Sequence, residues 1–368
     1  MSLSLSTLVR LGVLVTLLAN AVAIAISQTG VRHVAKRVEC ETPYTTLNGY
    51  FLPSRETTPR VIDAATGAIS PIPITDKHHL DHASFSPWRD EEGRYQVVGR
   101  WSSANEQLDA EPGRGIARYS FPDGQLLEKI ETDMIVAGPP CWFPGISTRV
   151  IFPAGDGKLY VTNFREDENA SGPSSQPELV RWDVEGFARA EDFAVNDLIW
   201  PRDPRFGGRM LATIALVDSS SRTTLLRPSM YWLELDELGT TVVAATPVAT
   251  SDDLLEQSMI RCPTVVQADD GKLSLVILAR SKQSSAWQAW LASLEFESPQ
   301  SLAMWDSAKA TLLIHGCVPS TPAISRDHQW LACLAEKTSG APQVLRVRLT
   351  PAHKAQSSDK LANYARSR

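Results

Sequence analysis

The chain has 368 residues, of which 43% are hydrophobic and 21% charged, with a formal net charge of −6. This composition is typical of a globular protein with one large all-β domain or two smaller domains. Lys and Arg do not gather into a basic stripe, so nucleic acid is not an expected partner. The 10 Trp and 24 Pro favour strands separated by turns over long helices.

The N-terminal segment, residues 1–27, predicts a signal peptide or an uncleaved signal anchor. Arg10 precedes an apolar run from Leu11 to Ile26, and small residues with cleavage-site spacing follow. The run is short for a membrane span, which needs about 20 residues. Three basic residues come next: Arg32, Lys36 and Arg37. They favour a cytoplasmic flank, so a cytoplasmically facing anchored form is the alternative to export to the periplasm or cell envelope.

A degenerate repeat extends through residues 42–350. Its clearest part is an h-x-x-h-x-h strand, where h is apolar or aromatic, and its six copies end 51 to 63 residues apart. The copies are Pro59–Ala64, Ile116–Phe121, Leu179–Val184, Met230–Leu235, Leu291–Phe296 and Val344–Leu349. A repeat with this period predicts stacked supersecondary units.

Each unit is predicted to hold four short antiparallel strands. An apolar strand precedes each copy, at Gly49–Leu52, Val97–Trp101, Leu159–Phe164, Met210–Leu216, Leu273–Ala279 and Trp330–Ala335. Polar loops lie between the two, at Ser102–Gly115, Arg165–Gln176, Asp218–Ser229, Ser281–Ser285 and Glu336–Pro342. Most units open with a third type of strand, at Ala83–Pro87, Pro140–Pro144, Asp197–Pro201, Cys262–Val266 and Pro322–Ser325.

These units predict an all-β fold, a single six-bladed β-propeller over residues 42–350. A four-stranded sheet with two apolar faces cannot stand alone, and radial stacking around an axis buries both faces. The first unit is poor in its inner strand and the last lacks an outer one, so we expect Val38–Leu47 to supply a closing strand. Residues 28–41 are otherwise a linker, and 351–368 a polar tail. Two stacked β-sandwiches are the alternative.

The opening strands and the turns after them resemble the TolB-like and WD-repeat-like bacterial propellers. The resemblance is carried by Phe85-Ser86-Pro87, Asp269-Asp270-Gly271-Lys272-Leu273 and Ile324-Ser325-Arg326-Asp327. It covers most of the chain after residue 42, although the full S-P-D-G signature never occurs intact. The resemblance implies a propeller fold and binding of proteins or ligands on the propeller faces, and it implies no particular chemistry.

The five cysteines show no C-x-x-C pair, and an odd number cannot pair completely within one chain. They are Cys40, Cys141, Cys262, Cys317 and Cys333. We expect most of them to be small buried apolar residues. One disulfide, between Cys317 and Cys333, is the alternative.

The segment from His78 to His82 is the one cluster with metal-ligand chemistry. Imidazoles beside a carboxylate are ligand types for zinc and copper. Neighbouring residues of a strand point to opposite faces, so at most a subset of His78, His79 and His82 could converge. The alternative is a solvated connector between the first two blades, near the central channel. We expect no cofactor.

Two aspartates, Asp81 and Asp197, precede the opening strands of two units and are the candidate catalytic residues. Propeller hydrolases of glycosides or lactones place carboxylates or a metal at the channel mouth, and two carboxylates can act as acid and base. Other units carry Pro140, Arg261 and Thr321 there, so no carboxylate ring is evident, and turn or capping roles are the alternative. The chain has no G-x-S-x-G, H-E-x-x-H or phosphate-binding glycine motif.

Tryptophans at strand ends or near loops supply candidate binding residues, because exposed aromatics often anchor interfaces. They are Trp88, Trp101, Trp287, Trp290 and Trp305. The binding residues we single out are His79, His82, Trp88, Trp101 and Trp287. Packing between blades is the alternative role for the tryptophans.

Together these features predict an exported or membrane-anchored propeller that serves as a non-catalytic binding scaffold. We expect a monomer that binds a protein partner or a small ligand on a propeller face, with any membrane anchoring through Leu11–Ile26. The polar loops between second and third strands are the expected recognition surface. The alternative is a glycosidase-like or lactonase-like propeller hydrolase with carboxylates at the channel mouth.

Overall fold

The computed structural model describes eighteen stretches of the chain, all within the compact unit Cys40–Arg368. They are residues 44–49, 60–63, 68–75, 78–90, 92–103, 114–165, 176–187, 193–201, 203–216, 228–249, 259–267, 271–280, 286–295, 304–305, 310–317, 320–324, 328–335 and 343–349. The predicted signal or anchor segment, the linker and Cys40 lie outside them. Within these stretches, no helix has the length and apolar character to cross a membrane.

The first three sheets each contain four short antiparallel strands, the number that the sequence predicted for each unit. The first has the order β22 (Ser320–Thr321), β1 (Tyr44–Gly49), β2 (Arg60–Asp63) and β3 (Ile69–Pro71). The second has the order β4 (His78–Phe85), β5 (Tyr95–Ser103), β6 (Arg114–Phe121) and β7 (Leu126–Glu131). The third has the order β8 (Cys141–Trp142), β9 (Arg149–Pro153), β10 (Leu159–Asn163) and β11 (Glu178–Leu179).

The remaining strands form two larger sheets. The fourth sheet has the order β13 (Phe193–Ile199), β14 (Met210–Leu216), β15 (Ser229–Leu235), β16 (Thr241–Ala249) and β12 (Arg181–Trp182), with the 3₁₀ turn η2 (Pro204–Phe206) between β13 and β14. The eight-stranded sheet contains, in chain order, β17 (Met259–Gln267), β18 (Leu273–Arg280), β19 (Trp287–Glu295), β20 (Met304–Trp305) and β21 (Thr311–Cys317). It continues with β23 (Ala323–Ile324), β24 (Trp330–Ala335) and β25 (Gln343–Arg348).

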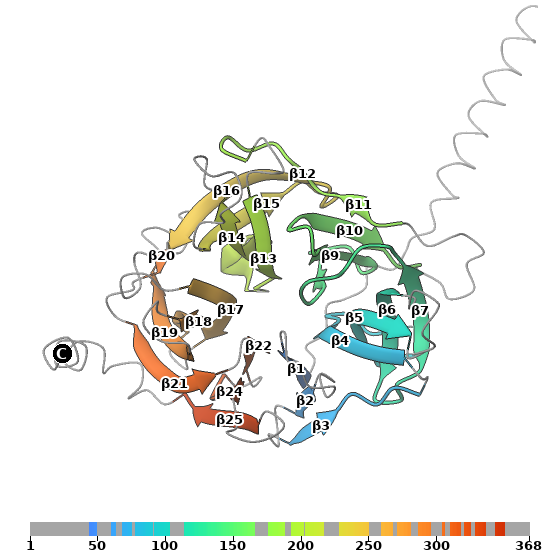
Figure 1. Cartoon of the computed structure of the whole chain (residues 1–368), viewed down its shortest axis with the longest axis horizontal. Coiled ribbons are helices and arrows are strands. Elements are labelled where there is room, and N and C mark those ends of the chain that lie inside the picture. Colours follow the sequence, from blue (N-terminus) through green and yellow to red (C-terminus); the bar gives the residue numbers. More distant parts are fainter. Residues whose placement is uncertain are drawn as a thin grey trace, which may run out of the picture. The chain divides into compact units, whose positions relative to one another are not determined.

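Within this unit the sheets follow one another around a common centre, with β4, β13 and β17 on the inside and β3, β7 and β25 on the outside (Figure 1). Antiparallel sheets repeated radially around an axis are the architecture of a β-propeller. The prediction of an all-β propeller is therefore confirmed, and the alternative of two stacked sandwiches is not.

The first sheet combines strands from the early and late parts of the described chain. Tyr44–Leu47, the described part of the predicted closing segment, pairs with β2 of the first sheet. The other edge of β1 pairs with the short strand β22, through Asn48↔Thr321 and Gly49↔Ser320. The late part of the chain therefore adds a strand to the first sheet, which fits that unit's weak inner strand.

The third sheet corrects the predicted strand order. Leu159–Asn163 pairs with β9 on one side and β11 on the other, so it is a third strand and not a second. The predicted strand Leu179–Val184 is split: Leu179 pairs with β10, whereas Arg181 and Trp182 pair in parallel with β16 of the next sheet. The prediction has no strand at β9, although Val150, Ile151 and Phe152 are apolar and buried, so it counts β10 one position too early.

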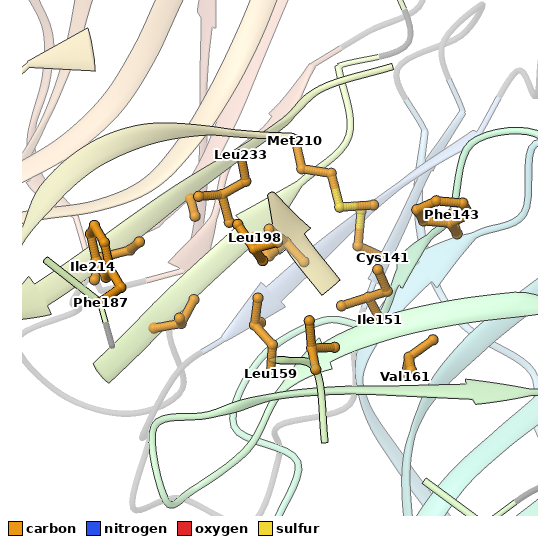
Figure 2. Close-up of a cluster of buried hydrophobic side chains, with 14 of the residues drawn as sticks. Cys141, Phe143, Ile151, Leu159, Val161, Phe187, Leu198, Met210, Ile214 and Leu233 are labelled. Atoms are coloured by element: carbon orange, nitrogen blue, oxygen red, sulfur yellow. The ribbon is translucent and has the colours of Figure 1, made fainter. Parts of the chain in front are cut away.

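Buried apolar clusters fill the space between neighbouring sheets. One such cluster joins the third and fourth sheets and includes Ile151, Leu159, Leu198, Met210 and Leu233 (Figure 2). Burying an aliphatic side chain of this size contributes about 1.5–3 kcal/mol. Because each sheet contributes to clusters on both of its faces, the core is the set of interfaces between the sheets and not the interior of any one of them.

Tight turns between strands depend on glycine at two close approaches. Gly124 has φ +69°, and a Cβ there would lie 2.0 Å from the carbonyl oxygen of Pro73. Gly239 has φ +66°, and a Cβ there would lie 2.8 Å from the ring of Phe143. Only glycine takes this backbone conformation at no steric cost.

Candidate functional site

A central cavity of about 150 Å³ lies among the inner strands of the propeller. Its wall is formed by Thr46, Ala83, Ser84, Phe85, Pro139, Pro140, Cys141, Trp142, Asp197, Leu198, Ile199, Trp200 and Cys262. The C-terminal parts of β4, β8 and β13 supply most of these residues. Most of the wall is apolar, with proline and tryptophan prominent.

The predicted recognition loops lie largely outside the described residues, and the ends of the flanking strands β5 and β14 are away from the cavity. The register His78↔Ser103 places the end of β5 beside the start of β4, whereas the cavity residues Ala83 to Phe85 are at the end of β4. The end of β14 likewise lies beside the start of β13, away from the cavity residues Asp197 to Ile199. The third strand β10 instead ends beside the start of β9, at the same end as the cavity residue Trp142.

Two inner strands carry the same kind of β-bulge beside the cavity. The register of β4 shifts between Asp81 and Ser84, and that of β17 shifts between Arg261 and Thr264. Inside the bulges, His82 has φ +46° and Cys262 has φ +53°. Residues other than glycine rarely take this conformation, which costs on the order of 1–3 kcal/mol and often occurs at functional sites.

Asp197 is the most fully enclosed carboxylate near the cavity, with only 2% of its surface exposed. The Arg261 guanidinium donates Nε to Oδ2 at 2.8 Å and Nη2 to Oδ1 at 3.2 Å. The Thr213 hydroxyl and the Cys262 backbone N–H also donate to Oδ2, at 2.5 and 3.1 Å. Asp197 therefore joins β13 to β17, so that the fourth sheet is tied to the eight-stranded sheet.

The surroundings of Asp197 determine its ionisation. Burial by itself would raise the pKa of this carboxyl, but the charge of Arg261 and the hydrogen bonds from Arg261, Thr213 and Cys262 lower it below its usual value. A general acid in glycoside hydrolysis needs the opposite shift. Asp197 is thus held as an ionised acceptor.

Asp81 is paired with an arginine of its own sheet. Arg100 lies directly across from it on β5 and donates Nε to Oδ1 at 2.6 Å, with a second hydrogen bond from Nη2 to Oδ2. Nη1 of Arg100 donates to the Val136 carbonyl oxygen at 3.0 Å, which reaches the segment before the third sheet. The two candidate catalytic carboxylates therefore both have bidentate arginine partners.

His82 interacts electrostatically with the members of both ion pairs and is 6% exposed. Burial lowers the pKa of His82 to about 4; Asp81 and Asp197 oppose this shift, and Arg100 and Arg261 add to it. The imidazole is therefore neutral at neutral pH.

The histidine segment is strand and not connector, because His78, His79 and His82 all lie in β4. His79 is exposed, His82 is buried and His78 is intermediate, packing edge-on to Trp101 at 5.1 Å. In the stretches of chain that the structure describes, no group of three or more His, Cys, Asp or Glu side chains could hold a metal ion. His78 and His79 are neighbours on a strand and point to opposite faces, and His82 lies inside the bulge of β4.

Trp88, Trp101 and Trp287, singled out as candidate binding residues, are buried, which agrees with the other role considered for them, packing between blades; the side chain of Trp305 lies outside the described residues. Trp88 and Trp101 are 2% exposed, and Trp287 is 7% exposed. Trp88 stacks on Trp200, with ring centroids 6.2 Å apart, and meets Trp142 edge-on at 5.9 Å. Trp287 and Trp101 are buried although they lie at or near the ends of β19 and β5, because both belong to apolar clusters.

Sequence reasoning named Asp197 but missed its partner as a functional group. Arg261 was noted only as the residue that breaks a carboxylate ring, and it is in fact the counter-ion of Asp197. Ser84 and Thr46 were also missed. The Ser84 hydroxyl donates to the Pro140 carbonyl oxygen at 2.5 Å, and the Thr46 hydroxyl donates to the Ala83 carbonyl oxygen at 2.8 Å. These contacts join positions 37 to 64 residues apart, and no local motif marks them.

No family model and no curated protein matches this chain. Solved structures similar to it include an endo-arabinase from Bacteroides thetaiotaomicron, at 9% identity and TM-score 0.43, over 74% of this chain and 94% of that one. A chain of the mitotic checkpoint complex matches at 11% identity and TM-score 0.39, over 85% of this chain and 94% of that one. A trans-sialidase from Ruminococcus gnavus matches at 10% identity and TM-score 0.40, over 80% of this chain and 65% of that one. Identities and TM-scores this low carry no information about activity.

Proposed function

We propose that this protein is a non-catalytic β-propeller binding module whose central cavity receives one small apolar or aromatic group. The observation that carries the proposal is the pairing of both channel carboxylates with arginines, beside a cavity whose wall is mainly apolar. The group belongs either to a small ligand or to a protein partner, and the size of the cavity limits what enters it.

The wall chemistry supports an apolar occupant. Phe85, Leu198, Ile199 and Trp200 line the cavity together with two consecutive prolines. Ligand sites of this kind gain affinity from buried apolar area and orientation from a few polar groups. Here the polar groups are few, and the Asp197 carboxylate is already occupied by its own donors.

The volume supports a small occupant. An apolar cavity of about 150 Å³ holds a molecule the size of benzene, whereas drug-sized ligands occupy about 300–1,000 Å³. A sugar chain needs a longer cleft lined by hydrogen-bonding groups. A single ring or branched aliphatic group fits both the volume and the wall.

The finer points of architecture belong to this proposal. The sheets, with the eight-stranded sheet divided at the β21–β24 contact, support six blades, and the position of β22 on β1 supports closure of the ring. Membership of the TolB-like group stays a prediction. We further propose a monomer that is exported to the periplasm or cell envelope through residues 1–27 and does not bind nucleic acid.

The binding test uses small apolar probes, namely indole, toluene and N-acetylated amides of leucine, phenylalanine and proline, measured by calorimetry. Ile199→Trp fills the cavity and should weaken binding at least about tenfold. Leu179→Trp makes the same chemical change on the outer strand β11, at a side chain that is 50% exposed, and should leave binding unchanged. The proposal fails if no probe binds at millimolar concentration or if both variants bind as the parent does.

The hydrolase alternative is tested on the same protein. Turnover is measured on a panel of glycosides and lactones, with metal analysis of the purified protein and with Asp81→Asn as the key variant. We expect no turnover by the parent protein. Turnover that Asp81→Asn abolishes would establish the hydrolase instead.

Location has its own test. A reporter fused after Leu349, active on only one side of the membrane, reports whether the propeller is exported. We expect the signal of an exported domain, and a cytoplasmic signal would contradict the export proposal without touching the cavity.

A further inference from the structure

We propose that Cys317 and Cys333 form a disulfide that links β21 to β24 when the protein folds in the presence of a disulfide oxidant. This proposal concerns a covalent modification and does not depend on what the cavity binds. It identifies one pair among the five cysteines of the chain.

The register of the two strands brings these cysteines to one face. Cys317 is the last residue of β21 and pairs with Ala335 of β24. Cys333 is two residues before Ala335, and positions two apart on a strand share a face. The two cysteines are therefore diagonal neighbours across the strand pair, a position from which side chains interact.

Both side chains are enclosed in the same apolar cluster. Cys317 is 3% exposed and Cys333 is fully buried, and both belong to a cluster with Leu278, Leu331 and Leu349. Each thiol affects the ionisation of the other, so that the pKa of Cys317 is lowered and that of Cys333 is raised well above its usual value. The structure thus holds both side chains as free thiols within one apolar cluster.

The other described cysteines are placed differently. Cys262 belongs to the same cluster, but its thiol donates to Oδ1 of Asp197 at 3.7 Å. Cys141 lies in the cluster between the third and fourth sheets. The geometry therefore favours a disulfide between Cys317 and Cys333 over any disulfide that includes Cys262 or Cys141.

The place of the link gives it a structural consequence. Five residue pairs join β21 to β19, whereas Cys317↔Ala335 is the single pair that joins β21 to β24. A disulfide here connects the strands β17–β21 to the strands β23–β25, where the described backbone pairing is weakest. Gly316, with φ +79° and open space around its Cα, lets the end of β21 adjust to the bond.

The chemistry is thiol–disulfide exchange with a small disulfide such as oxidised glutathione. The Cys317 thiolate attacks one sulfur of the oxidant and releases one glutathione thiolate. The Cys333 thiol then loses its proton to water and attacks the Cys317 sulfur of the mixed disulfide, which releases the second glutathione. Two cysteine thiols are oxidised and one glutathione disulfide is reduced to two thiols.

Burial determines when the exchange occurs. An oxidant cannot reach either sulfur in the folded state, because 3% or less of each residue is exposed. The bond therefore forms during folding, before β24 docks on β21. Oxidation of the already folded protein should be at least about tenfold slower than oxidation during refolding.

The experiment refolds the full chain from denaturant with either oxidised glutathione or a reducing agent. Remaining thiols are alkylated in denaturant and counted by mass, and disulfide-linked peptides are identified after digestion. We expect the oxidised sample to lose two of its five thiols and to yield a Cys317–Cys333 linked peptide. Cys317→Ser and Cys333→Ser should each abolish that loss, whereas Cys141→Ser and Cys262→Ser should not.

Stability provides a second measurement. Closing a loop of about 15 residues should raise the melting temperature of the oxidised protein by about 5 °C over the reduced protein, and the Cys317→Ser variant should show no such difference. Five free thiols after oxidative refolding, or a linked peptide from another pair, would overturn the proposal. If the variants fold poorly, the linked peptide of the parent protein still decides the question.

Discussion

Two aspartate–arginine pairs differ in how they are enclosed; Asp197 lines the cavity, and Asp81 lies in β4, two residues before the cavity residue Ala83. The Asp197–Arg261 pair joins two sheets, and its side chains are 3% and 16% exposed. The Asp81–Arg100 pair joins neighbouring strands of one sheet, and its side chains are 19% and 32% exposed. The chemistry is the same in both pairs.

The difference teaches that burial, and not the residue types, decides what such a pair does. A buried charge that loses its counter-ion is left in a medium that cannot solvate it, whereas water replaces the lost partner of an exposed one. Asp197 also holds the backbone N–H of Cys262, a residue with positive φ, so it fixes the bulge in β17. We therefore expect the Asp197 pair to support the ring and the Asp81 pair to contribute less.

The largest expected effect comes from removing the buried carboxylate. Asp197→Ala leaves the charge of Arg261 and the N–H of Cys262 without their acceptor, and should lower the free energy of unfolding by about 3–5 kcal/mol. Urea unfolding followed by tryptophan fluorescence measures it. A loss below about 1 kcal/mol would show that water reaches Arg261 and that the comparison between the two pairs is wrong.

The next effect is a pH dependence that originates between the two pairs. The unfolded His82 binds a proton below its ordinary pKa of 6.5, whereas the folded residue does so only near pH 4. Stability is therefore full above pH 6.5 and falls as the pH drops towards 4, by about 3 kcal/mol in total. Unfolding measured from pH 7.5 to 4 tests this.

The control for the pH effect keeps the backbone conformation. His82→Asn is suited to positive φ and does not titrate, so it should remove most of the slope between pH 6.5 and 4. His315→Asn changes an exposed histidine of β21 and should keep the slope. Asp197, whose pKa is lowered, adds a loss only below its ordinary value of 3.8 and does not confuse this window.

The third effect is the smaller contribution of the other pair. Asp81→Ala should lower the free energy of unfolding by roughly 1 kcal/mol, because Arg100 stays partly solvated and keeps its bond to the Val136 carbonyl. A double-mutant cycle with Arg100→Ala gives the coupling between the two side chains. Coupling as large as that of Asp197 with Arg261 would remove the distinction drawn above.

The smallest effect is the response to salt. Raising the ionic strength from 0.1 to 1 M shortens the screening length from about 10 to 3 Å. The coupling of Asp81 with Arg100 should fall by roughly half, while that of Asp197 with Arg261 should stay within error. Repeating both cycles in 1 M sodium chloride measures the difference, and equal screening of the two pairs would contradict it.

The sequence predicted most strands where the repeat was regular, and it failed where the repeat was not. Met210–Leu216 and Trp330–Ala335 have the predicted bounds, because each is a short, nearly continuous apolar run that is buried along most of its length. In the third sheet the strand predicted to be second is the third strand, β10, so the predicted strand order differs from the observed order by one position. For the candidate site, the sequence singled out Asp81, Asp197 and His82, which lie on the inner strands β4 and β13, whereas Arg261, Ser84 and Thr46 were not recognised.

By itself, the sequence determined the period of the strands and hence the propeller, since a four-stranded unit with two apolar faces must stack on its neighbours. Only the tertiary structure decided which side chains meet at the centre, because Asp197 and Arg261 are 64 positions apart and come together through the stacking of two sheets. Local patterns report which face of a strand is buried, and contacts between sheets depend on how the whole ring closes.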